Sequence, residues 1–292
     1  MGTLHPHVLK YVGDRIQRGE ITATTARNIR NHLWQFATSF GDRPLDQLGQ
    51  AALDRWMVSM RRQQLADSTI ALRISSVRTF ARWCVQRRIV AVDWTTQAPK
   101  IRRTRQVPRD LTNDHFWLIL DHATTDRTRL LVWLMFGCGL RCIEISRLHV
   151  DDYDPVTGLL HVTGKAGHHR HVPVPDPVVR AMHTYLAPRH STGPLVRVED
   201  GTRALGHARI SALVGNTIRA AGIKLRNYDG RSAHGLRAAA ASDLLDHADG
   251  DLRVAQQFLG HANLATTSIY LRRAHTERVR DAQNARMLRR AA

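Results

Sequence analysis

Four separated segments in the second half of the sequence carry side chains suited to work on an anionic group. Arginine, lysine and histidine donate hydrogen bonds to anionic oxygens, and the planar fork of arginine matches two oxygens of a phosphate. A tyrosine hydroxyl can act as a nucleophile once a base or a positive pocket takes its proton. The residues are Arg141 with Glu144 three positions later, Lys165 in a Gly-Lys-Ala-Gly turn, the pair His234 and Arg237, and His261 followed nine positions later by Tyr270.

In this order and spacing, the six basic and tyrosine residues resemble the tyrosine recombinase, or phage integrase, family. Each has an ordinary structural explanation when taken alone. Arg141 and Glu144 could form a helical ion pair, Tyr270 could be a core residue, and Lys165 could be a solvated turn. The combination, on suitable elements and in the right order, is what indicates the family. The resemblance covers nearly the whole chain, because the helical first part is similar to the family's core-binding domain.

The resemblance implies a role for each residue in cutting a DNA phosphodiester. Attack on phosphorus builds negative charge on the non-bridging oxygens, and Arg141 and Arg237 would balance that charge with fixed donors. Tyr270 would be the nucleophile, and a 3′-phosphotyrosine would keep the energy of the broken bond for rejoining without ATP. The family further assigns protonation of the leaving 5′ oxygen to Lys165, extra donors or proton transfer to His234 and His261, and a supporting position to Glu144.

The sequence predicts no cofactor and no metal, because no cluster of metal-binding carboxylates is visible. His168, His169 and His171 look similar to metal ligands, but the neighbouring bases and the lack of a Cys or acidic partner favour phosphate contact or simple exposure. Cys84, Cys138 and Cys142 cannot form a disulfide framework and lack the paired spacing of a zinc site, so we expect reduced, buried thiols.

The spacing between His261 and Tyr270 requires a break in the helix. Nine residues of one continuous helix turn through about 900°, so the two side chains would face opposite ways and could not share a phosphate. Gly260 is a typical helix stop, and Asn263 is a typical N-cap for a new helix. The sequence therefore predicts that the helix ends at Gly260 and that a second short helix brings Tyr270 back.

Hydrophobic periodicity predicts the elements that must position these residues. Apolar residues recur at helical spacing over 22–40, 51–60 and 68–85, which predicts an all-helical bundle over roughly 7–90. Because the bundle begins near residue 7, we expect the simple, two-domain kind of recombinase, without an arm-binding domain.

In the second part, turn signals separate two strand-like runs between helical segments. We expect a mainly α fold: a helical core-binding domain plus a mixed α/β catalytic domain with a small antiparallel β-sheet. The expected helices are 112–123, 126–148 and most of the chain from 177 onward, with breaks near 191–193, 227–230 and 260–263, and the expected strands are 159–162 and 170–174.

The domain organisation follows from these patterns. We expect a DNA-binding domain over 1–92, a basic linker over 93–109, and a catalytic domain over 110–292 that ends in a tail helix. The linker is expected to follow a DNA backbone, although a solvated run of charge would look the same. Its basic residues are Lys100, Arg102, Arg103 and Arg105.

Composition points to a polyanionic partner. The 43 Lys and Arg residues exceed the 25 Asp and Glu residues, which gives a formal net charge of +18. The longest apolar run, over 130–140, is much shorter than the roughly 20 residues of a membrane span, and no secretory segment is visible. We therefore expect a cytoplasmic, DNA-associated protein of a bacterial host, with double-stranded DNA as its partner and no membrane.

The expected function is site-specific DNA recombination, with integration and excision of a phage or mobile element as the favoured role. We expect a homo-oligomer on DNA, as a tetrameric synapse, with an excisionase or a DNA-bending protein as a possible helper. A Xer-type recombinase that resolves chromosome or plasmid dimers is the nearest alternative. A type IB topoisomerase and a catalytically silent DNA-binding regulator are more distant, and the latter would lack one of Arg141, Lys165, Arg237 or Tyr270.

Overall fold

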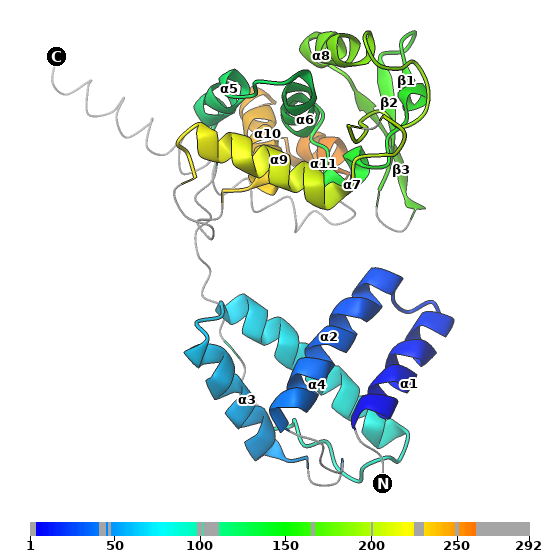
Figure 1. Cartoon of the computed structure of the whole chain (residues 1–292), viewed down its shortest axis with the longest axis vertical. Helices are drawn as coiled ribbons and strands as arrows, with labels where there is room; N and C mark the ends of the chain where they lie inside the picture. The colour runs from blue at the N-terminus through cyan, green and yellow to red at the C-terminus, as the bar shows by residue number, and fades with distance from the viewer. Residues whose placement is uncertain are drawn as a thin grey trace, which may run out of the picture. The chain divides into compact units, whose positions relative to one another are not determined.

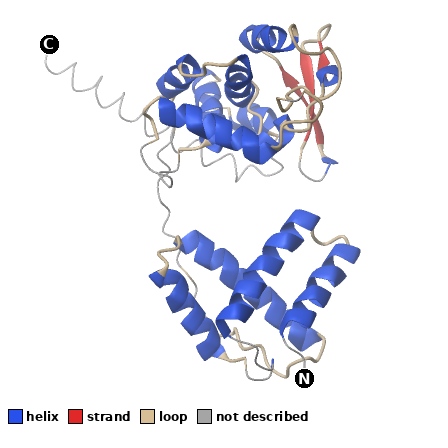
Figure 2. Cartoon of the chain, in the orientation of Figure 1, coloured by secondary structure: helices blue, strands red, loops and turns tan. Residues whose placement is uncertain are grey.

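The protein divides into two compact units, residues 1–106 and residues 107–292, in the computed structural model (Figure 1). Among the described residues, helices predominate in both units, and the strands all belong to the second unit (Figure 2). The predicted fold class, mainly α with a small antiparallel sheet, is therefore confirmed. The structure describes residues 4–40, 45, 48–97, 101, 111–164, 167–199, 201–224, 231–248 and 251–260.

The first unit is a helical bundle, as the periodicity predicts. Helix α2 packs against the three other helices. Apolar faces meet in a core where Leu33, Phe36 and Phe80 are fully buried, and Tyr11 meets Phe80 edge to face with 5.4 Å between ring centroids. Trp94, which lies within the range expected for the linker, is also buried in this core. The helices are α1 (Leu4–Gln17), α2 (Ala23–Phe40), α3 (Gln50–Arg62) and α4 (Asp67–Gln86).

The second unit is built around helix α6, whose residues between Leu130 and Met135 are buried almost all the way round because α8, α9 and α10 pack against it. The side chains of Thr112 and Thr125 cap α5 and α6 by accepting backbone N–H bonds in the first turn. The helices are α5 (Asn113–Asp121), α6 (Asp126–Gly137), α7 (Cys142–Ile145), α8 (Asp176–Leu186), α9 (His207–Ala220), α10 (Ala233–His247) and α11 (Leu252–Leu259).

The prediction of one helix over 126–148 is wrong, because α6 ends at Gly137 and a separate short helix, α7, follows. Gly139 lies between them with a φ of +59°, in the left-handed region that side chains disfavour. A Cβ on Gly139 would also lie 2.6 Å from the Phe258 ring of α11. Both the backbone conformation and the neighbouring Phe258 therefore require glycine at position 139.

The sheet of the second unit is a meander of three antiparallel strands in the order β1, β2, β3, within the described residues. The strands are β1 (Tyr153–Asp154), β2 (Leu159–Thr163) and β3 (His169–Pro173), preceded by the single turn η2 (Val150–Asp152). Both predicted strands are present, with ends that differ by at most one residue. Leu160 pairs with Val172, and Val162 pairs with Arg170, so these four side chains share one face of the hairpin.

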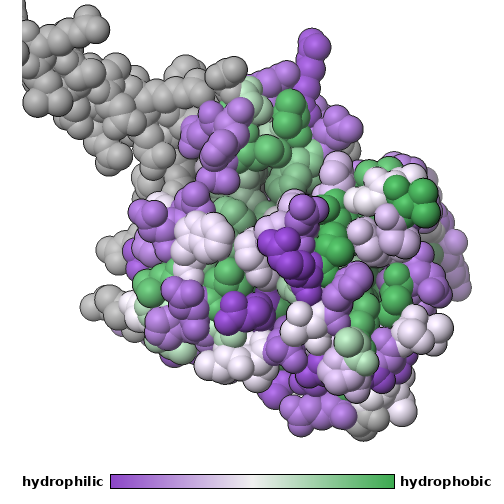
Figure 3. All heavy atoms as spheres, turned by 90° about the horizontal axis from the view of Figure 1, so that it is seen from above, coloured by the Kyte–Doolittle hydropathy of each residue, from purple (hydrophilic) through white to green (hydrophobic). Residues whose placement is uncertain are grey.

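Within the described residues, no helix is both long and apolar enough to cross a membrane. On the face that Figure 3 presents, hydrophobic side chains form small groups between hydrophilic ones. The structure divides into its two units between residues 106 and 107. The domain boundaries that the sequence indicates at residues 92 and 110 stay a prediction.

Candidate active site

Arg141 stands at the start of α7, where the chain turns out of α6. It is the N-cap of α7, and its backbone N–H donates to Oε2 of Glu144 over 2.9 Å. Its Nη1 donates to Oε1 of the same carboxylate over 2.7 Å. The Arg141 side chain keeps 33% of its surface exposed. One end of the guanidinium is therefore fixed, while the rest of the side chain remains open to a ligand.

Glu144 is a buried carboxylate whose side chain is only 1% exposed. Burial alone would raise the pKa of Glu144. The hydrogen bonds from Arg170 and from the Arg141 backbone N–H, together with the charges of Arg170 and Arg237, instead lower this pKa from 4.5 to about 2. Glu144 is consequently ionised at neutral pH, and it can hold several cations in fixed positions.

Arg170 binds this carboxylate from the side of the sheet. Its Nη1 donates to Oε1 of Glu144 and its Nη2 donates to Oε2, each over 3.0 Å. This is the bidentate geometry in which two parallel N–H groups match two carboxylate oxygens. The Arg170 side chain is 14% exposed, so the pair is largely shielded from solvent.

Arg237 approaches from α10 and is buried, with 1% of its side chain exposed. Its Nη1 lies 3.6 Å from Oε2 of Glu144 and also donates to the carbonyl of Gly139, while its Nη2 donates to the carbonyl of Leu259. Arg237 thus joins three separate parts of the unit: the turn before Arg141, the carboxylate, and the end of α11.

Three guanidinium groups, those of Arg141, Arg170 and Arg237, surround the one carboxylate of Glu144. The formal charge of these four side chains is therefore 3 − 1 = +2. A fixed excess of positive charge around hydrogen-bond donors attracts an anion, and a phosphate fits the fork of an arginine. We refer to Arg141, Glu144, Arg170 and Arg237 as the arginine cluster.

His234 lies in the first turn of α10, three residues before Arg237. Desolvation of its ring, followed by the charges of Arg237 and Arg141, lowers the pKa of His234 below its ordinary value of 6.5. The neutral imidazole is therefore the main form at pH 7. A neutral imidazole next to an anion site can accept a proton from a nearby hydroxyl group.

The structure brings together four of the predicted site residues: Arg141, Glu144 and Arg237 by direct contact, and His234 beside them. The other predicted site residues lie outside the described residues. They are Lys165, His261 and Tyr270 of the expected catalytic set, and Lys100, Arg102, Arg103 and Arg105 of the expected linker.

The chain positions next to two of these residues do lie at the arginine cluster. A Cβ on Gly164 would lie 3.9 Å from Oε1 of Glu144, and a Cβ on Gly260 would lie 2.6 Å from Cδ of Arg170. Gly260 has a φ of +60° and ends α11, which confirms the predicted helix stop. The predicted N-cap at Asn263 lies outside the described residues.

Arg170 is the residue that sequence reasoning missed. The run over 169–173 alternates between exposed and buried positions, and Arg170 shares the inner face with Val172. An arginine at an inward position of a strand requires an acidic partner, and that requirement was the available signal. The partner, Glu144, lies 26 residues earlier in the chain, so periodicity alone does not identify it.

The cysteines are free, and two of the three are buried as predicted. Burial raises the pKa of Cys84 and of Cys138 to about 12, so both thiols stay protonated. Cys142 is only partly buried, which differs from the prediction. Among the described residues, no group of three or more His, Cys, Asp or Glu side chains could hold a metal ion.

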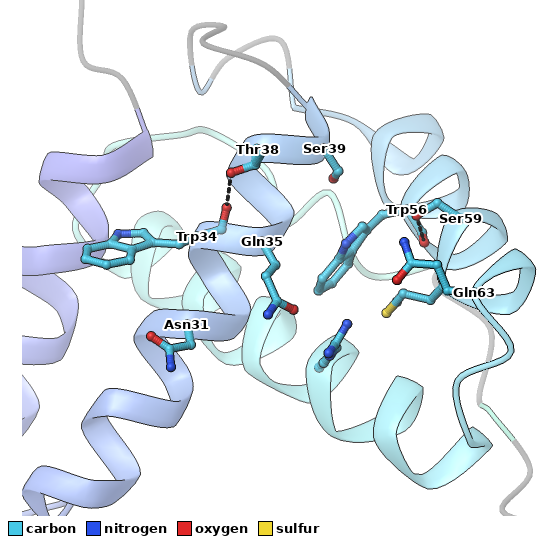
Figure 4. A pocket seen from close by; sticks show the side chains of 10 residues that line it. Asn31, Trp34, Gln35, Thr38, Ser39, Trp56, Ser59 and Gln63 are labelled. Atoms are coloured by element: carbon cyan, nitrogen blue, oxygen red, sulfur yellow. Dashed lines mark hydrogen bonds between the residues drawn. The ribbon is translucent and has the colours of Figure 1, made fainter.

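The first unit contains a separate pocket of about 530 Å³ between α2, α3 and α4 (Figure 4). Amide side chains of Asn31, Gln35 and Gln63 line it beside Trp34 and Arg73. Amides and arginines are the side chains that read base edges most often. The pocket shares no residue with the arginine cluster.

The sequence matches known families over most of its length. Residues 109–277 match the phage integrase family, and residues 10–88 match the phage integrase N-terminal SAM-like domain. The tyrosine recombinase XerC of Mycobacterium tuberculosis (strain ATCC 25177 / H37Ra) is 35% identical over 241 residues, which cover 77% of this chain and 79% of the relative.

Two solved structures are similar in fold. A lambda integrase (75-356) dimer bound to a COC′ core site has a TM-score of 0.78 at 18% identity, covering 92% of this chain and 95% of that one. A lambda integrase tetramer bound to a Holliday junction has a TM-score of 0.75 at 18% identity, covering 90% and 78%. At this level of identity, the likeness establishes the fold.

Proposed function

Because the chain belongs to the phage integrase family of tyrosine recombinases, we propose that it is a site-specific DNA recombinase that acts through a 3′-phosphotyrosine at Tyr270. The observation that carries this proposal is the convergence of Arg141, Arg170 and Arg237 on the buried carboxylate of Glu144, within the described residues. The resulting positive site suits a phosphodiester, whose transition state gains negative charge on its oxygens.

Cleavage exchanges one phosphodiester for another. The hydroxyl oxygen of Tyr270 attacks phosphorus, and the bond from phosphorus to the 5′ oxygen breaks. The tyrosine proton passes to a neutral imidazole, for which His234 and His261 are the candidates, and the leaving oxygen takes a proton from Lys165. A 5′ hydroxyl from a second strand then attacks the phosphotyrosine and gives its proton to Lys165, while the bond from phosphorus to Tyr270 breaks and the tyrosine takes back a proton from the imidazole. The number of bonds is conserved, and no energy source is needed.

The two predicted arginines differ in what they offer the phosphate. Arg141 has one nitrogen held by Glu144 and a partly exposed side chain, which supports its role as a phosphate ligand. Arg237 donates to the carbonyls of Gly139 and Leu259, which uses two of its five N–H groups, but only 1% of its side chain is exposed. A direct contact with phosphate therefore requires this buried guanidinium to become accessible. In its buried position, Arg237 contributes its charge and fixes the turn before Arg141.

Integration and excision of a phage or mobile element is the role that we favour, and Xer-type dimer resolution is the second candidate. The XerC relative in Mycobacterium supports the second. A plasmid pair with two different attachment sites and a single plasmid with two directly repeated identical sites distinguish them. An integrase joins the pair, whereas a dimer-resolution enzyme excises the segment between the repeats.

The proposed partner is double-stranded DNA carrying core-type sites, with four protomers in the recombining complex. The basic residues expected in the linker, Lys100, Arg102, Arg103 and Arg105, would contact the phosphate backbone there. An excisionase or a DNA-bending protein would set the direction of the reaction. The setting for such a reaction is the cytoplasm of a bacterial cell, where the DNA is.

The test of the proposed function is a covalent trap. Wild-type protein, Tyr270→Phe and Tyr153→Phe are mixed with a nicked suicide substrate that contains the site, and adducts are counted on a denaturing gel. Tyr153 lies in β1 and provides a matched loss of one hydroxyl. We expect adducts with the wild type and Tyr153→Phe, and none with Tyr270→Phe. An adduct with Tyr270→Phe would refute the assignment, and relaxation of plasmids without a site would favour a topoisomerase.

A further inference from the structure

Arg170 is placed where the sheet meets the arginine cluster. It lies on β3 opposite Val162 of β2, on the face of the hairpin that also carries Leu160 and Val172. Those three apolar side chains are buried, and each has at most 1% of its surface exposed. Because the Arg170 side chain leaves β3 on this buried face, the direction in which its guanidinium points depends on the position of the hairpin.

The contact between Arg170 and Glu144 is bidentate, with both distances at 3.0 Å. The same two oxygens accept from Nη1 and from the backbone N–H of Arg141, so both carboxylate oxygens of Glu144 are shared between the two arginines. A displacement of Arg170 would therefore alter the acceptor geometry at Arg141.

Two glycines, Gly164 and Gly260, lie close to the Arg170 side chain. Gly164 lies at the neck of the β2–β3 hairpin, where its N–H donates to the carbonyl of His168 over 2.7 Å, and a Cβ there would lie 3.8 Å from Nη1 of Arg170. Gly260 lies on the other side, where a Cβ would lie 2.9 Å from Nε. The Arg170 side chain thus lies beside Gly164, the residue directly before Lys165.

We propose that Arg170 is a positioning residue that fixes the neck of the β2–β3 hairpin against Glu144 and Arg141, and so sets where Lys165 stands relative to the bound phosphate. The proposal rests on the proposed function, because it acts through the general acid Lys165. A lysine in the place of Arg170 would keep the charge but lose the second bond, and the hairpin could then rotate about a single contact. A displacement of about 1 Å at a reacting group is enough to lower a rate about 100-fold.

The test measures the single-turnover rate of covalent adduct formation at saturating DNA, with a bridging 5′ oxygen and with a bridging 5′ sulfur. A thiolate leaves without protonation, so sulfur bypasses the general acid. The variants are Arg170→Lys, Arg170→Met, Lys165→Ala and Arg141→Lys, with Arg180→Met on the exposed surface of α8 as the matched control. Arg170→Lys keeps the charge beside Glu144, so a folded protein is available even if Arg170→Met unfolds.

We expect the two Arg170 variants to bind a single site within about threefold of wild type, to lose 10- to 100-fold in rate with oxygen, and to recover most of it with sulfur. Lys165→Ala should recover in the same way, whereas Arg141→Lys should not recover, and Arg180→Met should match wild type. A general loss of structure would lower both rates equally, so recovery separates positioning from folding.

The outcomes separate the two proposals. If the sulfur substrate restores the rate of Lys165→Ala but not the rates of the Arg170 variants, the positioning role of Arg170 is overturned and the proposed function stands. Wild-type rates with the oxygen substrate in both Arg170 variants would also overturn the positioning role. Failure of Lys165→Ala to recover overturns the general acid itself and the Arg170 proposal with it, and the absence of any Tyr270 adduct overturns the proposed function.

Discussion

Replacement of Glu144 by glutamine should destabilise the second unit strongly at neutral pH. Glutamine keeps the shape of the side chain but removes the charge that holds Arg170 and Arg237 in a buried place. The pKa of Glu144 is about 2 against an ordinary 4.5, and this difference corresponds to roughly 3 kcal/mol of folding free energy. Breaking a buried ion pair by removing one partner costs about 3–5 kcal/mol in other proteins, which agrees.

Calorimetric melting at several pH values is the appropriate assay. For a unit of this size, 3 kcal/mol lowers Tm by roughly 6–12 °C. Because folding lowers the pKa of Glu144, its stabilisation is fully present above pH 4.5 and is lost as the pH falls towards 2. We therefore expect the gap in Tm between wild type and Glu144→Gln to be constant from pH 8 to pH 5 and to narrow steadily below pH 4.5.

Glu199→Gln is the matched control, because Glu199 is 88% exposed and pairs with Arg127 over 3.5 Å at the surface. Exposed pairs contribute about 0–1 kcal/mol, so this variant should melt close to wild type at every pH. The reasoning is refuted if Glu144→Gln melts with Glu199→Gln at pH 7. A gap that stays constant down to pH 3 would also contradict it, because the carboxylate would then not be the source of the stability.

Three further changes test other parts of the site. Arg141→Lys keeps the charge but loses the two parallel N–H donors of the guanidinium. The rate of adduct formation should fall at least 100-fold, on the order of the loss of one oxyanion donor, while DNA binding changes little. Cleavage at the wild-type rate would show that Arg141 has only a structural role. Gly260→Ala places a side chain on a left-handed backbone and against Arg170, so it should lower the free energy of unfolding by about 1–3 kcal/mol and slow cleavage. Gly222→Ala is the control: Gly222 has a φ of +70° with open space around it, so this variant should show the backbone strain alone. Deletion of residues 279–292 should leave single-site binding intact and weaken synapsis, measured as complex stoichiometry on paired sites; unchanged recombination would show that this segment does not join protomers.

Much of the fold is local and was predictable. The helices of the first unit follow from apolar residues at helical spacing, and the hairpin follows from alternation on either side of a glycine-rich turn. Gly260 ends α11 as its residue type indicates. The order of Arg141, Lys165, His234, Arg237, His261 and Tyr270 along the chain was enough to indicate the family. These features depend on neighbours within a few residues, which a sequence displays directly.

Tertiary structure decided the features that depend on distant contacts. The helix over 126–148 looks continuous in sequence, but α6 ends at Gly137, and the turn through Gly139 lies so close to Phe258 of α11 that no side chain fits there. Arg170 looks like an ordinary strand residue until the sheet brings it to Glu144, and the carboxylate then lies between arginines from three elements. Side-chain type and spacing set which groups are available, whereas their pKa values and contacts are set by burial and charge from segments far apart in the chain.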